Sequence, residues 1–206
     1  MLRVLLTGFQ PFGGESINPS YEAIKQLDIH HLPCELYVME LPVVFYEASR
    51  LIIDKMHEVD PDIIIMVGQA GGRKEISVER VAINLDDSSI PDDRGVSPQD
   101  DPISLFGPTA YFSTLPTKLI VSSLHEKHIP AKLSYSAGTY LCNHIFYSVM
   151  HQLDVSQKNQ VHAGFIHVPY ETSQTLYKQH HFSLDLNVIT NAIETIVVSC
   201  CESMSV

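Results

Sequence analysis

Short apolar runs alternate with amphipathic segments along almost the whole chain, and this alternation limits the folds that it can adopt. Runs typical of buried strands occupy residues 2–7, 35–41, 62–67, 131–135 and 161–167, whereas helical periodicity occurs at residues 18–27, 43–58, 116–128, 139–153 and 186–201. Buried strands that alternate with amphipathic helices form a mostly parallel sheet covered on both faces. We therefore expect a single-domain, three-layer α/β/α fold with a mostly parallel twisted sheet.

A second feature interrupts this alternation in the middle of the chain. Residues 76–85 form a further β-like run, and a long segment without periodicity follows it to Ala110. Loops of this length are usually functional or mobile. The chain otherwise contains no linker, repeat or low-complexity stretch, and its 206 residues with 45% hydrophobic content can bury one sizeable core. We expect one domain over residues 1–206.

The charge balance and the cysteine content narrow the class of protein. A net charge of −11 argues against nucleic-acid binding, which needs clustered lysine and arginine. The amino terminus lacks the pattern of a signal peptide, and the apolar runs are far shorter than the ~20 residues that cross a bilayer. Four cysteines without regular spacing suit a reducing compartment. We expect no nucleic-acid partner, no membrane partner and a cytoplasmic location.

Cys142 stands at the end of a turn of small residues that connects a strand-like run to a helical one. The segment SAGTYLCN occupies residues 136–143, so the thiol is expected in the first helical turn. The unpaired N–H groups and the positive dipole end of a helix favour a thiolate there. A free cysteine is also often a small core residue. Cys142 is therefore either a buried hydrophobic group or a nucleophile.

Two further residues favour the nucleophile. His167 ends the last buried apolar run, and the carboxyl ends of parallel strands form the edge where α/β proteins bind ligands. Glu79 lies in the β-like run beside Arg80, and a structural ion pair between these two is the alternative interpretation. A thiol, an imidazole and a carboxylate together supply the nucleophile, the base and the orienting group of thiol acyl transfer.

Three separated motifs resemble those of a known family. They are GQAGGR at residues 68–73 with ERVAIN at residues 79–84, SAGTYLCN at residues 136–143, and TGFQPFGG at residues 7–14 with NPS at residues 18–20. These motifs are similar to the signatures of the pyroglutamyl peptidase I, or pyrrolidone carboxyl peptidase, family. The resemblance extends to His167 and covers nearly the whole chain. It implies a cysteine exopeptidase that removes N-terminal pyroglutamate (5-oxoproline) from small peptides.

The resemblance also assigns roles to individual residues. Cys142 matches the family nucleophile, His167 its general base and Glu79 the carboxylate that orients the imidazole. The implied reaction is attack of the thiolate on the pyroglutamyl carbonyl, protonation of the leaving amine by His167, and hydrolysis of the thioester. Backbone N–H groups at the helix start are the expected oxyanion donors. Residues 1–206 then form a catalytic domain.

The pyroglutamyl group is a flat, uncharged lactam, which suits an apolar slot with a few polar contacts. The resemblance places Phe9 and Phe12 as the walls of this slot and Gln69 as its polar partner. Loop packing for the two phenylalanines and a turn position for Gln69 are the alternatives. Asn18 precedes a proline, as a helix N-cap residue often does, and we expect it to be structural.

Two positions in the loop after residue 85 need comment. Ser89 stands where family members commonly have an arginine. Asp92 matches a frequent family acid, but an aspartate-rich loop that contains proline is more typical of a solvated surface. We therefore leave Asp92 outside the catalytic set.

No motif predicts a metal or a cofactor. The glycines of residues 8–14 lack the lysine and hydroxyl residue of a phosphate-binding loop. Those of residues 68–72 lack the third-glycine spacing of a dinucleotide turn and lead into a segment that is not helical. The cysteines and the 11 histidines show no zinc-site spacing. Two other classes remain open: a different α/β enzyme, such as a nucleoside phosphorylase or an amidase, and a binding protein that keeps the pocket without the reaction.

Family members are commonly dimers or tetramers, so the resemblance implies a homo-oligomer. Residues 115–124 and 193–198 are apolar stretches, and we expect them to supply surface that is shared between subunits.

Overall fold

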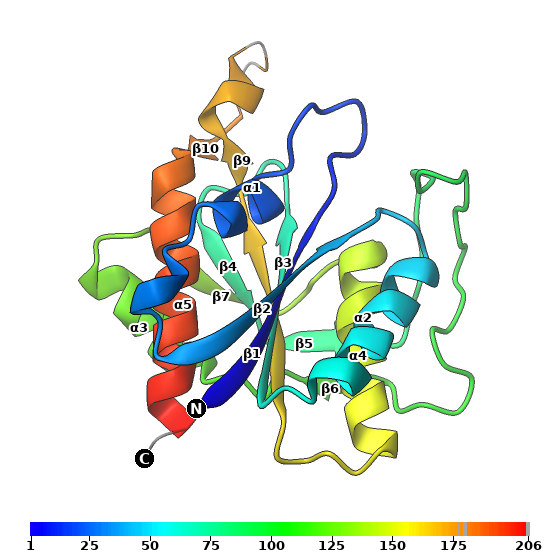
Figure 1. Cartoon of the computed structure of the whole chain (residues 1–206). Helices are drawn as coiled ribbons and strands as arrows, with labels where there is room; N and C mark the ends of the chain where they lie inside the picture. The colour runs from blue at the N-terminus through cyan, green and yellow to red at the C-terminus, as the bar shows by residue number, and fades with distance from the viewer. Residues whose placement is uncertain (177, 179–180, 205–206) are drawn as a thin grey trace.

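A six-stranded sheet forms the centre of the protein, whose computed structural model describes residues 1–176, 178 and 181–204 (Figure 1). The strand order is β2-β1-β3-β8-β4-β7. These strands are β1 (Leu2–Phe9), β2 (Cys34–Leu41), β3 (Ile63–Gln69), β4 (Ile76–Glu79), β7 (Ala131–Ser134) and β8 (His162–Val168). The α-helices are α1 (Pro19–Lys25), α2 (Glu47–Val59), α3 (Thr117–Glu126), α4 (Leu141–Val155) and α5 (Leu186–Met204). The predicted α/β class is confirmed.

The sheet is mostly parallel, as the alternation of strands and helices predicts. β1, β2, β3 and β8 pair in parallel, as do β4 and β7, whereas β4 runs antiparallel to β8. The exception has a physical cause, because only residues 70–75 connect β3 to β4. A connection this short cannot form the crossover that parallel strands need, so the chain turns back.

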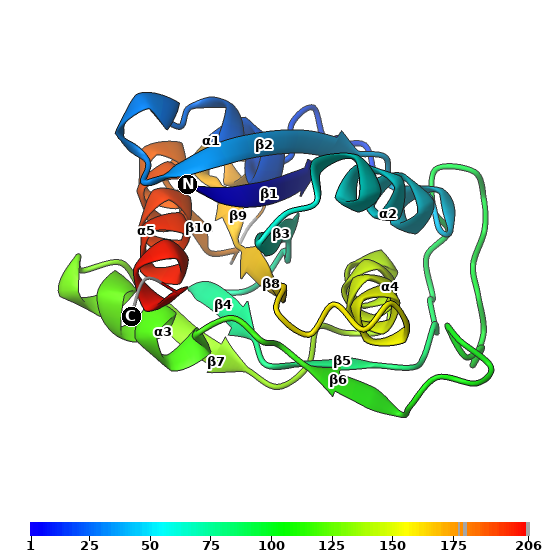
Figure 2. The ribbon, with the colours of Figure 1, turned by 60° about the horizontal axis from the view of Figure 1, so that its bottom comes forward.

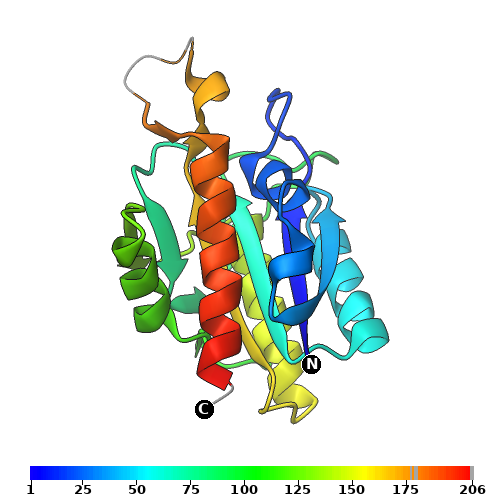
Figure 3. The same cartoon turned by 60° about the vertical axis from the view of Figure 1, so that its left-hand side comes forward.

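Helices cover both faces of the sheet in three layers. α1, α3 and α5 pack on one face and α2 and α4 on the other (Figure 2). α5 runs along its face between α1 and α3 (Figure 3). β3 contributes Ile63, Ile65 and Val67 to one apolar cluster, and Ile64 and Met66 to the other. Because successive side chains of a strand point to opposite faces, a strand buried on both sides must be apolar throughout.

The two apolar stretches that were expected to form a subunit interface are mostly part of the monomer's own core. Their large residues are buried in the cluster under α1, α3 and α5: Leu115, Ile120, Leu124, Ile193, Ile196 and Val197. The apolar pattern identifies residues that need burial, but not which surface buries them. The prediction that residues 115–124 and 193–198 are shared between subunits is wrong for these side chains.

The carboxyl ends of β1, β3 and β8 meet at one edge of the sheet. Phe9 ends β1, Gln69 ends β3, and His167 is the penultimate residue of β8. The short ribbon of β9 (Tyr170–Glu171) and β10 (Ser183–Leu184) and the 3-10 turn η2 (Thr172–Thr175) lie beyond this edge, beside the loop that follows β1 (Figure 1). A second ribbon, β5 (Val81–Ile83) with β6 (Ala110–Phe112), lies outside the main sheet.

Candidate active site

Cys142 lies in the first turn of α4, where the sequence predicts it. After β7 the chain turns through Gly138, whose φ of +81° is a conformation that glycine adopts more easily than other residues. Tyr140 is the N-cap residue and makes no side-chain hydrogen bond to the helix. The first backbone N–H groups of α4 therefore remain available to another acceptor. The Cys142 side chain is half-buried, whereas the other three cysteines are buried.

Gly68 brings Cys142 and His167 to the same face of the sheet. Gly68 of β3 pairs in register with His167 of β8, and paired residues of parallel strands point to the same face. A Cβ atom at Gly68 would lie 2.9 Å from Cys142 Sγ and 2.8 Å from Phe165 Cζ, so the sulfur packs directly over this glycine. Thiol and imidazole are thus neighbours across Gly68, although no hydrogen bond joins them in the described part of the chain.

A buried carboxylate holds the imidazole of His167. His167 Nδ1 and Glu79 Oε1 are 2.7 Å apart, and the two side chains are 4% and 0% exposed. Glu79 ends β4, and the antiparallel pairing of β4 with β8 places Ser77 opposite His167. Because Nδ1 donates to the carboxylate, Nε2 is the ring nitrogen that remains for reaction.

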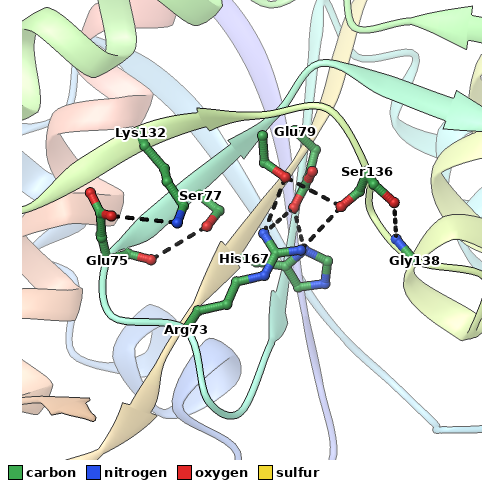
Figure 4. A network of polar contacts seen from close by, with 9 residues as sticks. Arg73, Glu75, Ser77, Glu79, Lys132, Ser136, Gly138 and His167 are labelled. Atoms are coloured by element: carbon green, nitrogen blue, oxygen red, sulfur yellow. Dashed lines mark hydrogen bonds and ion pairs between the residues drawn. The ribbon is translucent and has the colours of Figure 1, made fainter.

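The charged partner of Glu79 is Arg73, not Arg80. Arg73 Nη1 and Glu79 Oε1 are 2.5 Å apart, and Arg73 Nη2 donates to the carbonyl oxygen of Ser136 at 3.1 Å (Figure 4). Arg80 instead donates from Nη1 to the carbonyl oxygen of Ser113 at 3.2 Å. Successive residues of an extended segment point to opposite sides, which separates Glu79 from its sequence neighbour. The alternative ion pair between Glu79 and Arg80 is wrong.

Burial and neighbouring charges set the protonation states of the three groups. Burial, with the Glu79 carboxylate, raises the pKa of the Cys142 thiol to about 12 against an opposing effect of Arg73. Burial lowers the pKa of His167 below 6.5, although the hydrogen bond to Glu79 opposes this change. Burial also disfavours ionisation of Glu79, but the His167 hydrogen bond and the Arg73 charge hold its pKa below 4.5.

These directions correct one expectation from the sequence. We expected the helix start to favour a Cys142 thiolate, but desolvation of the sulfur raises its pKa, although Arg73 and a backbone hydrogen bond lower it. The resting site at neutral pH therefore holds a neutral thiol, a neutral imidazole and a carboxylate.

An apolar pocket opens beside Cys142. Its cavity volume is about 40 Å³, and it is lined by Phe9, Phe12, Asn18, Val43, Gln69, Tyr140, Leu141 and Cys142. The three residues expected to contact a substrate, Phe9, Phe12 and Gln69, all lie in this lining. The described side chains that line the pocket include no Asp, Glu, Lys or Arg. The pocket therefore suits a neutral group.

Asn18 has the structural role that was predicted and also lines the pocket. Its Oδ1 accepts from the backbone N–H of Ser20 at 3.1 Å, which caps α1, and Pro19 occupies the first helical position. Its Nδ2 donates to the carbonyl oxygen of Gln10 at 3.0 Å. The Asn18 amide thus fastens the loop that carries Phe12 to the start of α1.

A second buried pair, which the sequence analysis missed, includes a residue of the same helix two positions after Cys142. His144 Nδ1 and Asp86 Oδ2 are 2.7 Å apart, with side chains 2% and 1% exposed. Asn143 Nδ2 also donates to the carbonyl oxygens of Ile83 and Leu85. Through Asn143 and His144, these contacts attach the start of the long loop to the first turn of α4. Asp86 had no signal of its own, because it stands in a run of aspartates.

Asp92 is a buried organiser of the same loop rather than a solvated residue. Its Oδ2 accepts from the N–H of Phe45 at 2.9 Å, and its Oδ1 from the N–H groups of Arg94 and Val96 at 2.9 and 2.8 Å. The expected surface position is wrong, because backbone donors compensate the carboxylate for its lost hydration. Asp92 does not line the pocket, and Ser89 is exposed in the loop.

Among residues 1–176, 178 and 181–204, no group of three or more His, Cys, Asp or Glu side chains is arranged to hold a metal ion. No helix in this part of the chain combines the length and the apolar character needed to cross a bilayer.

Comparisons with known proteins agree with this geometry. A family model described as Pyroglutamyl peptidase matches residues 2–203. The chain is 44% identical over 204 residues to pyrrolidone-carboxylate peptidase 1 of Caldanaerobacter subterraneus subsp. tengcongensis, which covers 99% of this chain and 100% of that protein.

Two solved structures extend the similarity to the fold. Pyroglutamyl peptidase I of Bacillus amyloliquefaciens is 45% identical, with a TM-score of 0.94 over 98% of both chains. Pyrrolidone carboxyl peptidase of Thermococcus litoralis is 37% identical, with a TM-score of 0.95 over 100% of this chain and 96% of that one. Agreement of motifs, sequence and fold over the full length has one explanation, which is that this chain belongs to the pyroglutamyl peptidase family.

Proposed function

We propose that this protein is a cysteine exopeptidase that removes N-terminal pyroglutamate from small peptides. In this proposal Cys142 is the nucleophile, His167 the general base and acid, and Glu79 the group that orients the imidazole. The observation that carries it is a thiol that opens onto a neutral pocket, with a buried His167–Glu79 pair on the same face of the sheet. Membership of the family supports the choice of substrate.

Acylation begins from neutral groups. His167 Nε2 takes the proton of the thiol as Cys142 Sγ attacks the carbonyl carbon of the pyroglutamyl residue. The imidazolium then gives this proton to the nitrogen of the leaving peptide, and the C–N bond breaks. The pyroglutamyl group remains on Cys142 as a thioester.

Deacylation uses the same base. A water molecule gives its proton to His167 Nε2 and attacks the thioester carbonyl, and the sulfur recovers a proton as 5-oxoproline leaves. In both steps the carbonyl oxygen gains negative charge. The uncapped backbone N–H groups at the start of α4 are the donors that we assign to this oxygen.

Glu79 and Arg73 act on the reaction through His167. The Glu79 carboxylate fixes the ring with Nδ1 as the donor and stabilises the imidazolium that forms during each transfer. Arg73 keeps Glu79 ionised, since the two groups form an ion pair. Arg73 is a positioning residue that sequence reasoning missed, because it lies in the turn after β3 and its place depends on how that turn folds.

The pocket lining supports selection of a lactam. Phe9 and Phe12 offer apolar faces to a planar ring, and Gln69 offers a primary amide. An open-chain glutaminyl terminus carries an ammonium group, which would lose its hydration in a neutral pocket without gaining a partner. A proline terminus has the ring but lacks the lactam carbonyl, so the polar group built for it would stay unpaired.

Three further parts of the proposal concern the whole protein. Residues 1–206 act as one catalytic domain, because the pocket and the three catalytic groups come from strands of one sheet and the helix packed on it. A working nucleophile must stay reduced, which supports a cytoplasmic location. We also assign a homo-oligomer, a dimer or a tetramer, and the exposed side chains of Leu105 and Phe106 offer apolar surface for it.

The test is an assay of pyroglutamyl-aminomethylcoumarin with the native protein and with Cys142→Ala. We expect cleavage by the native protein and none by the variant, while Cys200→Ala, which removes a buried thiol elsewhere, stays active. Alkylation should be slow, because the Cys142 thiol is neutral at rest, but it should inactivate the native protein and label Cys142 first, because the other cysteines are buried. Equal turnover of Cys142→Ala would overturn the assignment of the nucleophile, and phosphate-dependent cleavage of a nucleoside would instead support a phosphorylase.

A further inference from the structure

The side chain of Gln174 connects three segments at the edge of the pocket. Gln174 lies in η2 and is 9% exposed. Its Nε2 donates to Gln69 Oε1 at 3.0 Å, to the carbonyl oxygen of Ile17 at 3.3 Å and to Glu15 Oε2 at 3.3 Å. η2 and the loop after β1 are 157 residues apart at this contact, yet lie side by side in Figure 1.

Backbone groups fix which end of the Gln174 amide is the donor. The N–H of Glu171 donates to Gln174 Oε1 at 2.9 Å, and the carbonyl oxygen of Ile17 accepts from Nε2. A backbone N–H can only donate and a carbonyl oxygen can only accept, so the two ends of this amide cannot be exchanged. The Glu15 carboxylate, which is acceptor-only when ionised, favours the same orientation.

This orientation determines what Gln69 presents to the pocket. Because Gln174 Nε2 donates to it, the Gln69 atom at that contact must be the oxygen. Gln69 Nε2 donates to no residue in the described part of the chain, and Gln69 lines the pocket beside Cys142. The polar atom that remains for a ligand is an N–H donor.

We propose that Gln174 is a positioning residue for substrate specificity, which sets the polarity of the pocket by holding Gln69 Nε2 as a donor to the lactam carbonyl of the pyroglutamyl ring. The inference deepens the proposed function and rests on it. If the Gln69 amide were rotated by about 180°, its oxygen would face the lactam oxygen, and the two acceptors would repel each other. Prolyl and glutaminyl termini lack a ring carbonyl, so Gln174 contributes to excluding them.

The experiment compares Gln174→Glu and Gln174→Met with the native protein. Glutamate keeps the shape but places carboxylate oxygens against Gln69 Oε1 and Glu15, and methionine removes the donor. Both variants should raise KM for pyroglutamyl-aminomethylcoumarin and the inhibition constant of 2-pyrrolidone about tenfold. The turnover number should stay within about threefold, because binding is lost equally from the ground state and the transition state.

Two comparisons separate this role from simple support of the loops. Lys178 forms an ion pair with Glu15 and so makes another link between the same segments without contacting Gln69. Lys178→Met should therefore change KM less than about twofold. Gln69→Glu keeps an acceptor for Gln174 but has no N–H for the lactam, so it should fold normally and weaken 2-pyrrolidone as much as the Gln174 variants do.

A double variant tests whether Gln174 affects substrate binding through Gln69. If Gln174 acts through Gln69, the double variant Gln69→Leu/Gln174→Met should bind no more weakly than Gln69→Leu alone. Additive losses, a fall in the turnover number at constant KM, or an equal effect of Lys178→Met would overturn the inference. If the Gln174 variants fail to fold, native affinity of Gln69→Glu for 2-pyrrolidone would overturn it. Absence of cleavage by the native protein would instead overturn the proposed function, and this inference with it.

Discussion

At the residue scale, the protonation of His167 depends on two neighbours that act in opposite directions. Glu79 stabilises the imidazolium through its hydrogen bond, whereas Arg73 and burial disfavour it. The outcome is a pKa below 6.5, so the imidazole is neutral throughout the neutral range. Arg73 thus limits how far Glu79 can raise the pKa of His167.

The first prediction concerns the pH dependence of kcat/KM. Activity requires neutral His167, so kcat/KM should fall as the pH decreases, with a midpoint below 6.5. Arg73→Gln removes the cation that disfavours the imidazolium and should move this midpoint to higher pH. The measurement is a pH series with pyroglutamyl-aminomethylcoumarin for both proteins. A midpoint that stays in place, or moves to lower pH, would contradict this account of His167.

A second prediction concerns the carboxylate. Glu79→Gln should lower kcat about 10²- to 10⁴-fold with little change in KM, since the imidazolium loses its stabilising charge in the transition state. Glu75→Gln is the matched control, because Glu75 pairs with Lys132 at 3.4 Å on a partly exposed surface near β4. A Glu79→Gln protein with a lowered melting temperature and native kcat would show that the carboxylate is only structural.

The sequence was informative about residues whose chemistry is distinctive and less so about their partners. Cys142 and His167 were candidates because of their expected places at a helix start and a strand end, and the resemblance to the family assigned roles to them and to Glu79. Arg73 could not be chosen over Arg80, because the choice depends on the turn between β3 and β4. The thiol pKa was predicted in the wrong direction, since burial of one sulfur atom depends on how the helix packs over Gly68.

At the scale of elements, the buried strands and the helices follow the predicted pattern closely. The first strand was expected at residues 2–7 and extends from Leu2 to Phe9, and the helix expected at residues 139–153 extends from Leu141 to Val155. The pairing of β4 with β8 was not predicted, because strand order depends on contacts far apart in the chain. Gln174 was missed for the same reason, since its partner Gln69 is 105 residues away.

A third prediction concerns the packing of α4 against the sheet. In Gly68→Ala the new Cβ would lie within 2.9 Å of both Cys142 Sγ and Phe165 Cζ, so α4 or the sulfur must move. We expect a loss of about 1–3 kcal/mol of unfolding free energy and a marked fall in kcat. Gly164→Ala is the control, because its Cβ would crowd Ser113 and Leu115 instead of the thiol.

Thermal unfolding and kinetics of the two glycine variants distinguish the effects. Both should be destabilised, but the folded fraction of Gly164→Ala should retain its kcat. Native kcat in folded Gly68→Ala would show that close approach of the sulfur to β3 is not needed for the reaction.

At the scale of the whole molecule, two exposed apolar residues offer surface for the proposed assembly, in place of the stretches first considered. Phe106 is 98% exposed and its neighbour Leu105 is 80% exposed, in the loop that leads to β6. Two large adjacent apolar side chains in water are a common sign of a surface that another protein covers. The sequence alone did not identify these two residues, because it does not show whether a short apolar pair is buried or exposed.

The fourth prediction follows from this loop. If Phe106 contributes to the contact between subunits, Phe106→Glu should shift the protein from an oligomer towards the monomer and leave the pocket intact. Light scattering at micromolar concentration measures the change, and Phe112→Glu, at a 64% exposed position in β6, tests a different part of the surface. A native protein that is already monomeric would contradict the assigned assembly.

The neutral thiol of Cys142 also bears on how this protein survives oxidative stress. Peroxides oxidise thiolates to sulfenic and higher acids and react poorly with protonated thiols. Burial raises the pKa of Cys142 to about 12, so the thiol is protonated at pH 7. In the proposed reaction the sulfur becomes nucleophilic when His167 accepts its proton, as the substrate carbonyl is attacked. We therefore expect the desolvation that raises the pKa of Cys142 also to slow its oxidation by peroxide in an idle molecule.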